Sequence, residues 1–157
     1  MYNFNEKEKR LEPSETLCQY CETEHSTSME DNYFVDLYME KNRTNVIVYR
    51  SVKYSKIPVG VPRCKTCMNV HSNANLMGGL LGWGIALLVV ILWFSIFGVS
   101  GFIGVLLFPF MGWGLMVWIE KSMIRKKQIY TKMEGAKQNE AVQDLVLSGW
   151  SFTMPMA

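Results

Sequence analysis

The chain has 157 residues, of which 49% are hydrophobic, and a net charge of +2. Its length suits one small domain. Its balanced charge argues against a dedicated nucleic-acid-binding protein, because neutralising phosphates requires a concentrated basic surface.

The first fifteen residues, 1–15, are polar and carry charges of both signs. They contain no apolar run, so they do not resemble a secretory signal, and their glutamates are atypical of a mitochondrial transit peptide. We therefore expect a flexible N-terminal arm. Any membrane insertion would depend on a segment further along the chain.

Four cysteines occur as two CxxC pairs, Cys18 with Cys21 and Cys64 with Cys67. A CxxC pair holds two sulfurs close enough to share one tetrahedral ion, and two pairs complete a four-thiolate site. Closed sites of four cysteines commonly hold zinc, so we expect structural zinc, with iron as the less favoured metal. The 42 intervening residues exceed the usual compact spacing.

The segment between the pairs is rich in β-branched and aromatic residues, which favours strands. We expect strands over Tyr33–Met39, 46–49 and 52–57, a polar turn at 41–45, and prolines that end the sheet. Alternation along the first strand places Tyr33, Val35, Leu37 and Met39 on one face. An antiparallel ribbon of this kind would bring the two cysteine pairs together.

Residues 16–71 resemble the broad zinc-ribbon and treble-clef class in their cysteine spacing and intervening strands. The resemblance implies a small α+β domain stapled by metal, which we place at 16–74. The sequence departs from many such knuckles after each pair, where Glu22 and Met68 follow the second cysteine directly. The resemblance is therefore to the class as a whole.

Three other roles for the cysteines are less consistent with the sequence. Structural disulfides are disfavoured on a reducing cytoplasmic side, a thioredoxin-like site needs a βαβ context, and haem attachment needs a histidine directly after the pair. His25 and His71 each lie four residues after a pair. His71 is the better candidate for a substitute ligand or a residue that orients a ligand, whereas an exposed loop position is the simpler interpretation of either.

An apolar stretch in residues 75–119 predicts a transmembrane helical hairpin. We place the spans at 76–97 and 102–119, joined by a small-residue turn at 98–101, because each matches the hydrocarbon thickness of a bilayer. Basic residues cluster outside the stretch, which places both termini in the cytoplasm. Those residues are Arg63, Lys65, Lys121, Arg125, Lys126 and Lys127.

Glycine, proline and the absence of charge within the spans add detail to the predicted hairpin. Gly78 and Gly82 have the GxxxG spacing that allows close helix approach, although glycine is also common in membrane helices without such a role. Pro109 is expected to kink the second span. Neither span contains an ionisable residue, which argues against a proton relay or a voltage sensor. A buried helix pair in a soluble protein is the alternative, although little other sequence is available to cover it.

Residues 120–157 predict a basic amphipathic helix over 120–133 and a C-terminal tail. We expect Gly135 to break the helix and Asn139 to cap a short second one that ends at Gly149. The apolar tail is expected to pack on the soluble domain or on a partner. Its large side chains are Trp150, Phe152 and Met154.

No catalytic motif is present, and a closed metal site leaves no open coordination position, so we expect no enzyme. The leading hypothesis is a membrane-anchored, zinc-ribbon-like interaction or structural protein, serving as a subunit, adaptor or assembly factor. Its partners would be membrane lipids and either other proteins or further copies of the chain. The alternatives are an oligomeric pore built from glycine-rich hairpins and, less favoured, a metal or redox sensor.

Overall fold

The computed structural model describes residues 2–46, 49–98 and 102–156. Side chains are described for all of these except 45–46, 49–50, 97 and 102–106. The chain forms two compact units, the first comprising 1–68 with 132–157 and the second comprising 69–131. We call them the sheet unit and the helix-pair unit, and describe each by itself.

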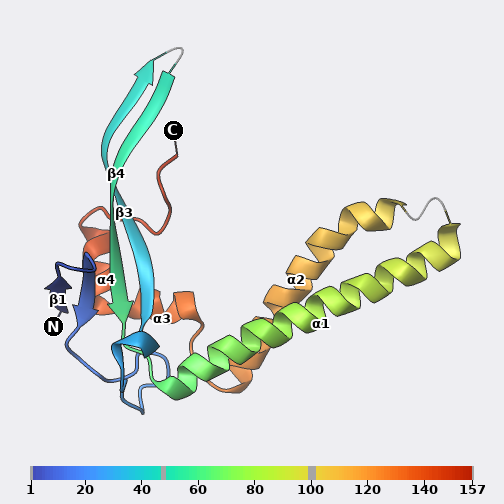
Figure 1. Cartoon of the computed structure of the whole chain (residues 1–157), viewed down its shortest axis with the longest axis horizontal. Helices are drawn as coiled ribbons and strands as arrows, with labels where there is room; N and C mark the ends of the chain where they lie inside the picture. Colours follow the sequence, from blue (N-terminus) through green and yellow to red (C-terminus); the bar gives the residue numbers. More distant parts are fainter. Residues whose placement is uncertain (1, 47–48, 99–101, 157) are drawn as a thin grey trace. The chain divides into compact units, whose positions relative to one another are not determined.

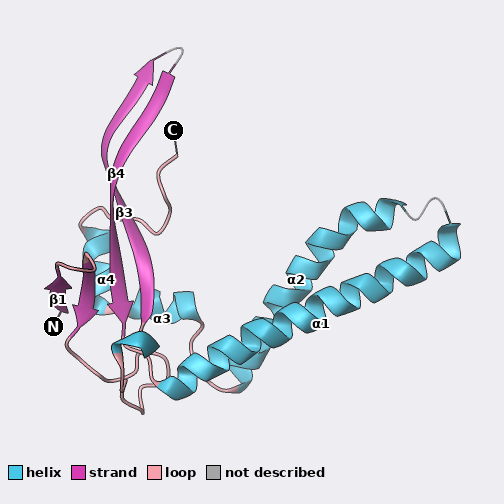
Figure 2. Ribbon diagram, in the orientation of Figure 1, coloured by secondary structure: helices cyan, strands magenta, loops and turns pink. Residues whose placement is uncertain are grey.

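The sheet unit is a small α+β domain, as predicted, built on a mixed four-stranded sheet of order β1-β2-β4-β3 (Figures 1 and 2). β1 and β2 are antiparallel, β2 runs parallel to β4, and β4 is antiparallel to β3. The strands are β1 (Tyr2–Asn5), β2 (Arg10–Pro13), β3 (Tyr33–Val46) and β4 (Tyr49–Val61). The N-terminal segment, expected to be a flexible arm, thus supplies two strands.

The ribbon between the cysteine pairs is antiparallel, as predicted, but longer than the sequence indicated. The segment 41–45 is strand instead of a turn, with a bulge between Glu40 and Asn42. Its residues are polar because both faces of this part of the ribbon are exposed, not because the chain reverses there. Pro58 does not end the sheet but pairs with Asp36 inside β4.

One face of the β3–β4 ribbon forms the core of this unit. Val35 and Leu37 are buried, as their alternation predicted, and Val59 and Val61 are buried opposite them on β4. Helices α3 (Lys132–Gln138) and α4 (Glu140–Leu147) complete the core. Their contribution includes the fully buried Ala136 and Val142.

Asn139 separates the two short helices and caps α4, as predicted. Its side chain accepts a hydrogen bond from the Val142 N–H at 3.3 Å, and Gly149 follows the helix with φ +97°. The expected helix break at Gly135 was wrong, because this glycine lies inside α3. The ring of Tyr20 occupies the space that a Cβ would need, so the glycine serves packing and does not end the helix.

The C-terminal tail packs on the sheet unit through its backbone. Ser151 exchanges two hydrogen bonds of 2.8 Å with Tyr38 on the outer edge of β3. Lys137 lies 5.8 Å from the centre of the Phe152 ring, whereas Met154 and Met156 are exposed. The predicted packing of the tail is therefore confirmed at its start and not at its end.

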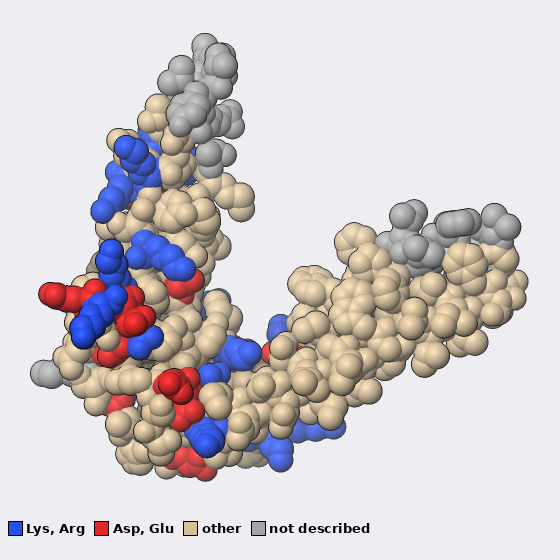
Figure 3. Space-filling model, viewed as in Figure 1, with Lys and Arg blue, Asp and Glu red and all other residues tan. Residues whose placement is uncertain are grey.

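The helix-pair unit consists mainly of α1 (Lys65–Phe97) and α2 (Phe102–Lys126). α1 ends at Gly98, which has φ +55°. Over Lys65–Ile96 it is long and apolar enough to cross a membrane, and only 11% of its most apolar window is buried. On the face drawn in Figure 3, no charged side chain interrupts the outer parts of these two helices.

The prediction of two spans is not supported, because α1 is the one candidate among the described residues. The second span at 102–119 begins with residues whose side chains are not described, and the turn at 99–101 lies outside the described residues. The apolar part that remains, 107–119, is shorter than the roughly 20 residues that cross a bilayer. α2 then continues through Glu120 and Lys121 to Lys126, earlier than the predicted end at residue 133.

Of the two interpretations of Gly78 and Gly82, the structure agrees with close helix approach. A Cβ on Gly82 would lie 2.7 Å from the backbone N of Met116, and one on Gly78 would lie 2.9 Å from its carbonyl oxygen. Gly112 on α2 receives the Trp83 ring in the same way, at 2.6 Å. Only glycine allows this separation of the two backbones.

Candidate metal centre

The two CxxC pairs meet in the sheet unit. The four cysteine Sγ atoms all lie within 4.8 Å of one another and could hold a metal ion. The sulfurs of Cys21 and Cys64 are 3.8 Å apart, well beyond the ~2.05 Å of a disulfide bond. Four thiolates at ~2.3 Å from a zinc ion in tetrahedral geometry would lie ~3.8 Å apart, so the cluster has the dimensions of such a site.

The elements that carry the cysteines are held together by backbone hydrogen bonds. Cys18 and Cys21 lie in the loop after β2, while Cys64 follows β4 and Cys67 lies in the first turn of α1. The Gln19 N–H donates to the Pro62 carbonyl at 3.0 Å, which joins the first pair to the strand end before the second. The Cys67 N–H also points at the Cys64 sulfur, at 3.4 Å.

The first pair is shaped by a tight turn. The Glu22 N–H donates to the Cys18 carbonyl at 2.9 Å, and the Cys18 N–H donates to the Glu24 carbonyl at 2.8 Å. Glu22 adopts a left-handed backbone with φ +57°. This is the position at which the sequence lacks the glycine of many zinc knuckles, so glutamate here accepts a conformation that costs an ordinary residue about 1 kcal/mol.

Burial and local hydrogen bonds shift the pKa values of three of the thiols in different directions. Cys18, Cys64 and Cys67 are buried, and Cys21 is partly exposed. Burial raises the pKa of Cys64 to about 12 and also raises the pKa of Cys67. Burial opposes ionisation of Cys21 too, but hydrogen bonds from Thr23 and the Glu24 backbone outweigh it and lower its pKa to about 6. A cation bound at the cluster would favour the thiolate forms of the buried Cys64 and Cys67.

Tyr20 connects the first cysteine pair to α3. It lies between Cys18 and Cys21 and is only 1% exposed. Its hydroxyl donates to the Lys132 carbonyl at 3.2 Å, and its ring fills the space beside Gly135. Tyr20 was not among the predicted site residues. Two features of the sequence indicate it: an aromatic residue inside a CxxC pair and a glycine in a later helix.

Arg63 takes a different role from the one expected. It is buried, with its Nε donating to the Asp31 carbonyl at 2.8 Å and its backbone N–H donating to Asn32 Oδ1 at 3.3 Å. It therefore fixes the chain directly before Cys64 instead of marking a membrane boundary.

The two histidines are not among the clustered ligand atoms, which in the described residues belong to the four cysteines alone. His25 is exposed and its Nδ1 lies 3.0 Å from Thr16 Oγ1, in agreement with the simpler interpretation. His71 is fully buried in the helix-pair unit, where its Nε2 lies 2.9 Å from the Tyr130 carbonyl. It thus fastens α1 to the segment after α2, and its predicted role near the metal stays a prediction.

No protein family model matches the chain, and neither a curated protein nor a solved structure matches it. The chemistry of the site therefore rests on the cluster itself. Four sulfurs at this separation can bind a soft or borderline divalent cation without leaving a position for substrate.

Proposed function

We propose that this chain is a membrane-anchored protein whose zinc-stabilised domain binds other proteins, as a subunit, adaptor or assembly factor of a membrane complex. The observation that carries the proposal is the pairing, in one short chain, of a four-cysteine cluster with an exposed apolar helix. Leu80 is 66% exposed and Ile96 is 73% exposed on α1. Such surface in water would be costly, at about 25 cal/mol per Å².

Zinc is the metal we propose for the four cysteines. Support comes from the all-sulfur donor set, the separation of the Sγ atoms and the burial of three of the four residues. A site with four protein ligands has no place for a reacting water, which favours a structural ion and argues against catalysis. The sheet unit is small enough that such an ion would contribute much of its stability.

We further propose that α2 accompanies α1 through the membrane. The close approach at Gly82 and Gly112 would place α2 beside α1 wherever α1 is embedded. Lys65 precedes the apolar part of α1, and Arg125 and Lys126 end α2. The positive-inside rule then favours cytoplasmic termini.

A homo-oligomeric assembly that permeabilises the membrane is the second candidate, and one observation favours it. Gly79, Gly84 and Gly114 have open space where a Cβ would stand. Small residues that face outward on a membrane helix allow another helix to approach. The apolar character of the helices argues against a wide aqueous pore.

Three measurements on the full chain, expressed in its native membrane, test these proposals. Carbonate-resistant membrane association and about one zinc per chain are expected, together with a partner that co-purifies after mild solubilisation. Chain released by carbonate would refute the anchor, and purified protein with no bound zinc or iron and four freely titrating thiols would refute the metal site. Ion flux in reconstituted liposomes, without a stable partner, would favour the second candidate.

The number of spans has its own test. A cysteine introduced by Ser100→Cys would react with a membrane-impermeant maleimide from the non-cytoplasmic side if α1 alone crosses or if both helices cross. A second cysteine, from Ser148→Cys, separates the two cases. It is protected from that side only if α2 returns to the cytoplasm.

A further inference from the structure

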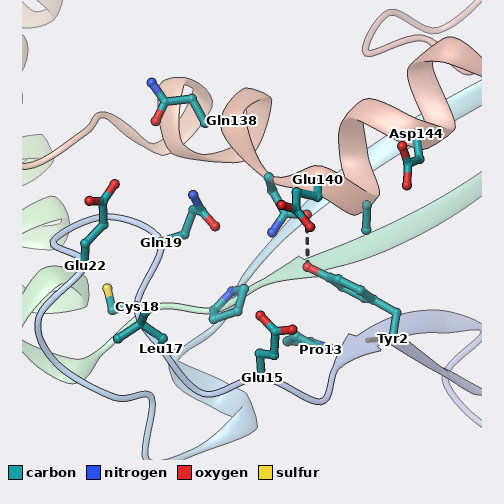
Figure 4. Close-up of a pocket in the computed structure, with 13 residues that line it drawn as sticks. Tyr2, Pro13, Glu15, Leu17, Cys18, Gln19, Glu22, Gln138, Glu140 and Asp144 are labelled. Carbon is teal, nitrogen blue, oxygen red and sulfur yellow. Dashed lines mark hydrogen bonds between the residues drawn. The ribbon is translucent and has the colours of Figure 1, made fainter.

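The sheet unit contains a cavity of about 700 Å³ that borders the proposed metal site at Cys18 but is not lined by the other three cysteines (Figure 4). Four separate parts of the chain form it: the N-terminal strands, the loop of the first cysteine pair, the residue after β4, and the junction of α3 with α4. Tyr2, Gln19, Pro62 and Asn139 represent the four parts. All of these belong to one compact unit.

The cavity is lined by carboxylates. Glu15 and Glu22 border it from the loop of the first cysteine pair, and Glu140 and Asp144 border it from α4. None of its lining residues in the described chain is Lys or Arg. Carboxylates gathered around a hollow with lower dielectric walls concentrate negative potential there, which favours a cationic ligand.

One wall is rigidly constructed. Asn139 is only 5% exposed, and its Oδ1 accepts hydrogen bonds from the Tyr2 hydroxyl at 3.0 Å and from the Val142 N–H at 3.3 Å. Burial raises the pKa of Tyr2 to about 12; the Asn139 hydrogen bond lowers it, and the charges of Glu15 and Glu140 raise it further. Both carboxylates therefore act on the phenol at one place in the cavity. The site is preformed, which reduces the entropic cost of binding.

The positive end of α4 does not reverse this preference. Asn139 caps the helix with its side chain, and Glu140 lies in the first turn. A carboxylate in the first turn offsets the helix dipole. An anion would thus find the Val142 amide already hydrogen-bonded and a carboxylate beside it.

We propose that this cavity binds a lysine- or arginine-bearing segment of a partner protein. A volume of about 700 Å³ is far larger than a single ion needs and lies within the range that holds an organic ligand or a few peptide residues. Long basic side chains would bury their methylene stems against Leu17 and Pro62 and place their charges among the carboxylates. The inference deepens the proposed function and rests on it, because it specifies the chemistry of the protein partner.

The test uses the full chain in nanodiscs of zwitterionic lipid, which do not attract basic peptides by themselves. Acetylated, amidated tetra-lysine and tetra-arginine peptides are titrated by calorimetry, with a tetra-glutamate peptide and empty nanodiscs as controls. Spermidine forms a separate arm, because it offers similar ammonium groups without a peptide. The variants are Glu140→Gln with Asp144→Asn, and the matched control is Glu6→Gln with Glu8→Gln, which removes equal charge from exposed positions outside the cavity.

Saturable binding of a basic peptide is expected, weakened about tenfold or more by the cavity variant, unchanged in the control variant, and weakened by added salt. No binding of either basic peptide, or equal binding by all variants, overturns the proposal. Stronger binding of spermidine than of the peptides overturns the peptide ligand and assigns the cavity to a small polyamine. Zinc content and thermal unfolding of each variant establish that it is folded.

The two proposals fail separately. A chain that associates with membranes, holds zinc and retains a partner, yet binds no basic peptide, keeps the proposed function and loses this inference. Peptide binding by a chain with no membrane association leaves the cavity intact and refutes the anchor.

Discussion

The sheet unit and the helix-pair unit are incomplete in opposite ways. The sheet unit covers a small apolar core with strands and two short helices, and it gathers four thiols that repel one another as thiolates. The helix-pair unit joins its two helices closely at glycines yet leaves α1 largely exposed. The cysteine cluster of the first unit could hold a cation, and the exposed apolar surface of the second suits a membrane or detergent. We therefore expect chelator and detergent to act on the two units independently.

Cys64→Ser has the largest expected effect. It removes one sulfur of the cysteine cluster in the sheet unit and leaves the helix-pair unit unchanged. Structural zinc contributes on the order of 10 kcal/mol to the folding of small zinc domains, comparable with the whole stability of a domain. We expect loss of bound zinc and rapid hydrogen exchange of β3 amides, while α1 amides in detergent stay protected. Wild-type protein stripped by chelator should show the same pattern and recover with added zinc. Loss of protection in both units together would contradict their independence.

Gly82→Leu tests the helix-pair unit. Its side chain would meet the Met116 backbone, and overpacking of this kind costs about 1–3 kcal/mol. We expect lower thermal stability of the helix pair in detergent with zinc content unchanged. Gly84→Leu is the matched control, because nothing lies within 4 Å of a Cβ at that position. Equal effects of the two substitutions would mean that the helices do not meet at Gly82.

Gly135→Ala tests the packing of α3 against Tyr20 within the sheet unit. A Cβ would lie 2.5 Å from the Tyr20 ring, which is buried and hydrogen-bonded. The clash outweighs the gain in helix propensity, for a net loss of about 1–2 kcal/mol in unfolding free energy. Denaturant unfolding monitored by near-ultraviolet circular dichroism measures it. Tyr20→Leu in the same chain should recover part of the loss, and a stabilised Gly135→Ala protein would show that the ring does not occupy this space.

Asn139→Ala has an expected effect of the same size as Gly135→Ala. It removes the cap of α4 and the acceptor of the Tyr2 hydroxyl, which together contribute about 1–2 kcal/mol. Asn139→Asp keeps an acceptor and should restore most of the stability in the same denaturant measurement. Equal stability of both variants would exclude capping as the role of this residue.

Local sequence rules predicted the parts of the fold that depend on near neighbours. The cysteine pairs, the buried alternation at Val35 and Leu37, the Asn139 cap and the glycine approach of the helices were all predicted from short patterns. The residues 41–45 were interpreted wrongly because polarity indicates exposure, and an exposed ribbon is as polar as a turn. β2 was missed because its pairing with β4 is set by contacts distant in sequence, and β1 was missed with it because β1 pairs with β2 alone. Tyr20 was missed because Gly135 lies over a hundred residues away.

The pairing of Ser151 with Tyr38 has a practical consequence for anyone who handles this chain. It is a single bridge on the outer edge of β3, where unpaired backbone groups invite another strand. A chain shortened before Trp150 loses this bridge, and its sedimentation would reveal the uncovered edge as self-association.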